Sequence, residues 1–127
     1  MSVITSGGVT STGDIVVNDS TNDVLEINQN GQISQIERTV TAGSWNLTTG
    51  NNWTCGNINI PSPINGVAGQ TGVLRLTAAP ASWPSPGGTL KYPNGEVPDI
   101  SLYPVIIPFY VQNATNVLLG TPVEGIS

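Results

Sequence analysis

The sequence predicts an all-β protein: a compact antiparallel β-sandwich or barrel with a long Pro/Gly-rich loop and an extended N-terminal arm. Its 127 residues include 15 Gly and 10 Pro, and these leave few windows as long as the roughly 8–20 residues of a typical helix. Between the breaks lie short runs rich in Val, Ile and Leu, some of which alternate polar with apolar residues as half-buried strands do. Three Asn-Gly pairs add a strong hairpin signal.

The expected strands follow one another along the chain. They are 14–18, 24–27, 57–60, 73–77, 103–111 and 117–119. The Asn-Gly pairs begin at Asn30, Asn65 and Asn94, and each could supply the two positive φ angles of a type I′ turn. The pair at Asn30 is the best hairpin candidate, because the segments on both sides of it lack Gly and Pro.

One segment allows a helix as well as a strand. Ile33, Ile36 and Val40 are spaced three and four residues apart, a spacing that would line one face of a helix. Gly31, Thr39 and Val40 are poor helix formers, however, and this favours the strand.

Residues 80–108 are rich in Pro and Gly. Each Pro lacks a backbone donor, so this stretch is not expected to form central strands of a sheet. It predicts instead a long, stiff loop, held in place by Trp83, Tyr92 and Tyr103. Residues 1–22 predict an extended N-terminal arm, and residues 23–127 then form the globular, oligomerising domain.

The balance of charges narrows the possible partners. Three Lys and Arg residues stand against eight Asp and Glu residues, which gives a net charge of −5. Nucleic acids and anionic membranes both select proteins with several clustered cations, so neither is expected as a partner. No run approaches the roughly 20 apolar residues of a membrane span. The N-terminus does not resemble a secretory signal, so synthesis in a cytoplasm is expected.

Catalytic side chains are also scarce. The chain has no His that could act as a base for Cys55, so we expect Cys55 to be a small buried hydrophobic residue. Glu96 and Asp99 come nearest to the carboxylate pair of a glycosidase, but they fit ordinary loop residues better. The sequence therefore predicts a protein that is not an enzyme and takes no cofactor.

An acidic segment is the one candidate cation site. It contains Asp14, Asp19, Asp23 and Glu26. Calcium takes six to eight oxygen ligands, which clustered Asp and Asn could supply. The spacing does not match an EF-hand loop. A solvated acidic turn is favoured, and no metal is expected.

Four aromatic residues admit two interpretations. They are Trp45, Trp53, Trp83 and Tyr92. Exposed, they would stack on sugar rings and form a glycan-binding face; buried, they would pack in the core or between subunits. Packing is favoured, although the polar neighbours of Trp45 and Trp53 keep the glycan-stacking interpretation open.

Self-association is the main functional expectation from composition. Charged residues make up 9% of the chain, so the surface lacks the usual guards against strand pairing between molecules. The runs 103–111 and 117–126 contain more Val, Ile and Leu than one small core needs. A homo-oligomer of closed symmetry would bury them. The expected subunit interface consists of Ile106, Phe109, Val111 and Leu118.

Several stretches resemble known proteins. They are Ala42-Gly-Ser-Trp-Asn-Leu-Thr-Thr-Gly-Asn-Asn-Trp-Thr-Cys55, Val67-Ala-Gly-Gln-Thr-Gly72, Leu76-Thr-Ala-Ala79, Ile107-Pro-Phe-Tyr-Val111 and Leu118-Leu-Gly-Thr-Pro-Val-Glu124. Together they resemble small virion structural proteins of tailed bacteriophages, particularly those of marine cyanobacterial phages. The resemblance covers roughly two-thirds of the chain, and its motifs are structural ones.

The resemblance implies a trimeric, β-rich module on the virion surface, made in the host cytoplasm, with no catalytic residues to transfer. We expect a capsid decoration, or cement, protein that stabilises the head. Its arm, through Val3 and Ile4, would bind the major capsid protein or other virion proteins. The alternative is a short fibre or receptor-binding module that recognises host surface glycans through the aromatic residues.

Overall fold

The computed structural model describes residues 3–5, 8–10, 13–18, 20–21 and 23–127, and the chain divides into two units, 1–36 and 37–127. The described regular elements are strands, apart from two short 3₁₀ helices, η1 (Leu47–Thr49) and η2 (Pro93–Gly95). The prediction of an all-β fold is therefore confirmed. The division differs from the predicted boundary after residue 22, because β3 (Ile15–Asn18) pairs across that point with β4 (Asp23–Ile27).

The N-terminal unit, residues 1–36, contains two antiparallel sheets. In one, β1 (Val3–Thr5) pairs with β2 (Gly8–Thr10). In the other, β3, β4 and β5 (Ile33–Gln35) follow in that order. The residues expected to form an extended arm are thus paired in strands. The strand that was favoured over a helix at Ile33 is present as β5.

The hairpin between β4 and β5 turns at Asn30-Gly31, although not through the expected type I′ turn. Within this hairpin only Gly31 has a positive φ, of 81°, and its amide donates to the carbonyl of Asn28 at 3.0 Å. This is a type I turn followed by a left-handed glycine, a common three-residue connection. Two consecutive positive φ angles occur instead within η2, at Asn94 (59°) and Gly95 (73°).

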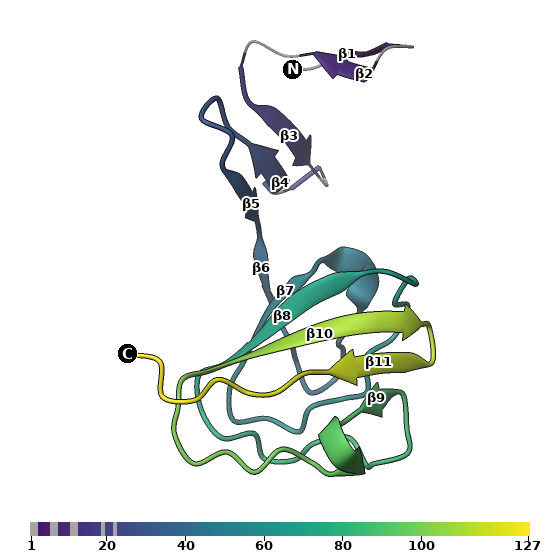
Figure 1. Cartoon of the computed structure of the whole chain (residues 1–127), viewed down its shortest axis with the longest axis vertical. Coiled ribbons are helices and arrows are strands. Elements are labelled where there is room, and N and C mark those ends of the chain that lie inside the picture. Colours follow the sequence, from purple (N-terminus) through teal and green to yellow (C-terminus); the bar gives the residue numbers. More distant parts are fainter. Residues whose placement is uncertain (1–2, 6–7, 11–12, 19, 22) are drawn as a thin grey trace. The chain divides into compact units, whose positions relative to one another are not determined.

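The C-terminal unit, residues 37–127, is built on one six-stranded sheet in the order β6-β7-β8-β10-β11-β9 (Figure 1). Its strands are β6 (Glu37–Thr39), β7 (Asn52–Cys55), β8 (Thr71–Leu76), β9 (Leu90–Lys91), β10 (Val105–Asn113) and β11 (Asn116–Leu119). The pairs β8–β10 and β10–β11 are antiparallel, whereas β6–β7, β7–β8 and β9–β11 are parallel. The sheet is therefore mixed rather than antiparallel, because long connections return the chain before each parallel strand.

Two expectations about this unit were wrong. The segment 57–60 forms no strand. It makes one isolated β-bridge, between Asn59 and Ser82. The Pro-rich stretch 80–108 does enter a central strand, because β10 begins at Val105 and runs through Pro108. The carbonyl of Pro108 accepts from the amide of Gly120 at 2.7 Å, just past the end of β11. The missing donor of Pro108 therefore faces the point where that ladder stops.

One face of the six-stranded sheet forms the core of the unit. Side chains alternate along β10, so Val105, Ile107, Phe109 and Val111 point inwards and are buried. They pack with buried residues from other strands and from the connections, namely Val40, Trp45, Leu47, Trp53, Cys55, Ile60, Leu74, Leu76, Leu90, Tyr92, Val117 and Leu119. Figure 1 shows the long connections of this unit running together below its strands.

Gly72 is the point of closest approach in this core. It lies directly across the β8–β10 ladder from Phe109. A Cβ atom at Gly72 would overlap both the ring of Phe109 and the carbonyl oxygen of Asn51. The absence of a side chain on β8 at this position therefore makes the space that the Phe109 ring fills.

We expect Gly72→Ala to lower the free energy of unfolding by about 1–3 kcal/mol, since overpacking forces side chains and backbone to shift. Urea unfolding, followed by tryptophan fluorescence, measures the change. Gly43→Ala is the matched control, because a Cβ there meets nothing within 4 Å. Equal stability of the two variants would contradict the packing described for Phe109.

Candidate functional site

The strongest candidate functional feature is an apolar surface on the side of the six-stranded sheet that faces away from the core. We call it the outer face, and it consists of Val73, Ile106, Pro108, Tyr110, Leu118 and Val123. Tyr110 is 48% exposed and Leu118 39% exposed. A contiguous apolar patch on an exposed sheet face is typical of a surface that binds another protein.

Strand register places the side chains of the outer face next to one another. Tyr110 on β10 is opposite Leu118 on β11, and Pro108 is opposite Val73 on β8. Ile106 forms a bridge with Val123, in which each amide donates to the carbonyl of the other residue. Side chains directly opposite on one face have Cβ atoms about 4.5–5.5 Å apart, so these pairs form one continuous patch.

An ion pair lies on the same side of the sheet as the outer face, with Arg75 directly opposite Ile106. The guanidinium of Arg75 donates to both carboxylate oxygens of Glu37, from Nε at 2.8 Å and from Nη2 at 2.6 Å. These hydrogen bonds hold the pKa of Glu37 below its usual value, with the positive charge of Arg75 acting in the same direction. The pair links β6 to β8 across the intervening β7.

The expected subunit interface is only partly on this surface. Ile106 and Leu118 belong to the outer face, whereas Phe109 and Val111 are buried in the core of the same chain. Phe109 and Val111 therefore cannot contact another subunit. The expectation combined residues from both faces of β10, although residues an odd number apart along a strand point to opposite sides.

Sequence reasoning missed four members of the outer face. They are Val73, Pro108, Tyr110 and Val123. A strict period of two along 106–110 would have found Pro108 and Tyr110. Val73 and Val123 become neighbours of Ile106 and Pro108 through pairing between distant segments, and no local pattern shows this.

The four aromatic residues do not form a glycan-stacking face. Trp45 and Trp53 are buried and contact each other edge-to-face, with ring centroids 6.5 Å apart. Trp45 also meets the ring of Phe109 edge-to-face. Tyr92 is buried and donates from its hydroxyl to the carbonyl of Pro84 at 2.5 Å.

Trp83 is partly buried, with its ring centroid 6.1 Å from that of Tyr92. These four side chains therefore pack in the core or against it, as was favoured over stacking on glycans. Cys55 is also buried, and burial raises the pKa of its thiol.

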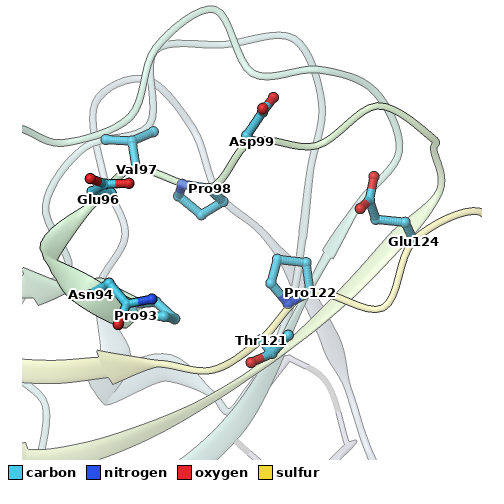
Figure 2. Close-up of a pocket in the computed structure, with 9 residues that line it drawn as sticks. All are labelled: Pro93, Asn94, Glu96, Val97, Pro98, Asp99, Thr121, Pro122 and Glu124. Carbon is cyan, nitrogen blue, oxygen red and sulfur yellow. The ribbon is translucent and has the colours of Figure 1, made fainter.

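A pocket of about 400 Å³ lies between the η2 loop and the C-terminal segment (Figure 2). Its lining residues are Pro93, Asn94, Glu96, Val97, Pro98, Asp99, Thr121, Pro122 and Glu124. It brings Glu96 and Asp99, considered above as a glycosidase pair, close to a third carboxylate from a distant part of the sequence. Both are exposed to solvent, unlike the acid of a glycosidase, which needs an apolar environment.

Glu124 has a structural role at this pocket. Its Oε1 accepts from the amides of Ser101 and Leu102, at 2.7 and 3.1 Å. Burial, followed by the negative charges of Glu124 and Asp99, raises the pKa of the neighbouring Tyr103. The pocket therefore presents negative charge and hydrogen-bond acceptors, which suit hydroxyl-rich ligands.

The remaining site expectations concern the N-terminal unit. Asp19 is outside the described residues, and so are the side chains of Asp23, Val3 and Ile4. Among the side chains that the structure describes, no three His, Cys, Asp or Glu residues are grouped so that they could hold a metal ion. The described carboxylate of Asp14 accepts from the amide of Gln29 at 3.0 Å.

A function for this chain has to be inferred from its fold and its surfaces. No protein-family model, curated protein or solved structure matches this chain. In the described part of the chain, no helix combines the length and the apolar character that crossing a membrane requires.

Tyr92 should make the stability of the protein sensitive to high pH. Burial raises the pKa of Tyr92 to about 12, whereas a tyrosine in the unfolded chain ionises near pH 10. The unfolded state therefore loses its proton first. The contribution of Tyr92 is complete below about pH 10 and disappears as the pH rises towards 12.

Urea unfolding at pH 8 and at pH 11 measures this loss. Tyr92→Phe should be less stable than wild type at pH 8 by about 1 kcal/mol, because the Pro84 carbonyl loses its donor. The difference should shrink at pH 11. An alkaline loss in Tyr92→Phe as large as that of the wild type would contradict the assignment.

Proposed function

We propose that this protein is a non-enzymatic virion structural protein of a tailed phage, and that it is a capsid decoration protein which stabilises the head. The observation that supports the proposal best is the outer face, a continuous apolar surface on a chain with few charges. A homo-oligomer, which we propose to be a trimer, buries this face between subunits. Ile106 and Leu118 remain interface residues in this proposal, joined by Tyr110 and Pro108.

The energetics favour burial of the outer face. Covering apolar surface contributes about 25 cal/mol per Å² removed from water. Two cations lie on the same side of the sheet, Arg75 opposite Ile106 and Lys91 opposite Leu118, and Arg75 is paired with Glu37. Closed symmetry limits the growth that a charge-poor β protein would otherwise undergo. The outer face thus suits contact between identical modules.

We also propose a finer architecture for the C-terminal unit. The long Pro/Gly-rich connections act as the second layer of a sandwich-like module, opposite the six-stranded sheet. Ile60 and Tyr92, both from connections, are buried with the strand residues and support this arrangement. A rigid module of this kind binds the assembled shell without reorganising, and a ligand that binds only the assembled state stabilises it by mass action.

A second candidate function is a short fibre or receptor-binding module for host surface glycans. The pocket in Figure 2 favours it, because Glu96, Asp99 and Thr121 offer polar groups to sugar hydroxyls from one cavity. This differs from the stacking face expected from the sequence, since its lining includes no aromatic residue. A glycan array with the purified protein separates the two functions, because a decoration protein gives no specific signal.

Substitution on the outer face tests the proposed assembly. Leu118→Asp should convert the trimer to monomers, because it introduces a charge into a surface that becomes apolar and dry on association. Leu118 is exposed in the chain, so the change should leave the core of residues 37–127 folded. Light scattering coupled to size-exclusion chromatography gives the mass of each variant.

Val67→Asp is the matched control. Val67 is 68% exposed and is not part of the outer face, so its variant should remain trimeric. A wild-type protein that elutes as a monomer at high concentration, or a Leu118→Asp variant with the wild-type mass, would refute the proposed interface. Counting copies in purified virions then locates the protein, since decoration of the head requires hundreds of copies and a tail fibre only dozens.

A further inference from the structure

The sheet β3-β4-β5 in the N-terminal unit has one face that is almost wholly apolar. Register places Ile15, Ile27 and Ile33 side by side across the three strands. Val17, Leu25 and Gln35 form the next row on the same face, two residues along each strand. We call these six side chains the N-terminal apolar face. Five of the six are aliphatic, and none is charged.

The chain segment itself does not cover this face. No side chain that the structure describes between residues 13 and 36 is buried. Ile33 is 67% exposed and Val17 is 49% exposed. A stable β domain needs a second layer against the apolar side of its sheet, and residues 13–36 supply only one layer.

Charge indicates what can cover it. Residues 1–36 contain four carboxylates and no Lys or Arg. The row between the two apolar rows, Val16, Glu26 and Ser34, points to the opposite side of the sheet. The N-terminal apolar face is therefore the side on which an identical segment can approach without bringing the Glu26 carboxylates of the copies together.

We infer that the N-terminal apolar faces of neighbouring copies pack against one another, so that residues 13–36 acquire a core only in the oligomer. The partners are the same sheets of the other copies, whose strand lengths and twist match by identity. In the proposed trimer, three such faces turn towards the three-fold axis and pack their side chains together there. This inference rests on the proposed function, because it requires an oligomer held together elsewhere.

The size of the face explains that requirement. Three strands about 4.8 Å apart, and two rows of side chains about 7 Å apart, give a face of only a few hundred Å². Stable interfaces bury about 800 Å² on each partner. The N-terminal sheets are therefore too small to hold copies together alone. Within an assembled trimer their effective concentration reaches the millimolar range, which makes the contact an intramolecular one.

Hydrogen exchange of the full chain tests the inference. The amides of β4, the central strand, should exchange at least 10-fold more slowly in the wild-type oligomer than in the monomeric Leu118→Asp variant. Ile33→Asn removes an aliphatic side chain from the N-terminal apolar face and should raise the exchange rate of β4 by a similar factor. Val16→Asn is the matched control on the opposite face, and it should exchange like the wild type.

Tryptophan fluorescence keeps the comparison interpretable. Trp45, Trp53 and Trp83 all lie in residues 37–127, so their spectrum shows whether that unit stays folded in each variant. Slow exchange of β4 in the monomeric Leu118→Asp variant would overturn the inference, because the sheet would then need no second copy. So would equal exchange in Ile33→Asn and Val16→Asn.

The mass of the wild-type protein and the exchange rate of β4 together separate the two proposals. A wild-type protein of monomer mass overturns the proposed function, and the inference fails with it. A trimer in which β4 exchanges as fast as in the Leu118→Asp variant overturns the inference alone. In that second case the N-terminal apolar face remains uncovered in the isolated oligomer, and its occupant would be another virion protein.

Discussion

The β8–β10 ladder is the interaction on which the rest of the C-terminal unit depends. Six residue pairs join the two strands, and the ring of Phe109 fills the space that Gly72 leaves open. The alternation of β10 sends one row of side chains into the core and the other row to the outer face. Gln70 secures the start of β8, because its side-chain amide donates to the carbonyl of Leu47 and to Asn51 Oδ1, each at 2.8 Å. One ladder therefore sets both the core and the candidate binding surface.

Local patterns in the sequence were sufficient to identify the strands that carry long apolar runs. The expected strands at 14–18, 73–77 and 103–111 correspond to β3, β8 and β10 within a few residues. The edge strand β9 was missed, because two residues show no measurable alternation, and so was β7 in the interior of the sheet, whereas β6 lies within the segment around Ile36 for which a strand was favoured. Parallel pairing also escaped prediction, since it depends on where long connections deliver the chain rather than on any turn signal.

The candidate sites were harder to predict, because burial depends on the whole fold. Trp45 and Trp53 have polar sequence neighbours, yet both are buried, since the residues around them alternate between solvent and core. The pocket joins residues 93–99 to Thr121 and Glu124, which the return of the C-terminal segment brings together. Such long-range juxtapositions have no counterpart in residue spacing. Strand period would nevertheless have separated Ile106 from Phe109, and its neglect caused the main error.

Both units need a core of buried apolar side chains, and they differ in where that core comes from. Residues 37–127 bury 16 apolar side chains in one cluster within a single chain, so this unit has the core that independent folding requires. Residues 13–36 have strands and an apolar face but bury no described side chain, so their order depends on what lies against them. A β-module that folds first and a sheet that gains its core from neighbours would couple the order of the N-terminal unit to assembly. Copies that are not assembled would then leave that sheet incomplete, and with it the surface offered to a larger particle.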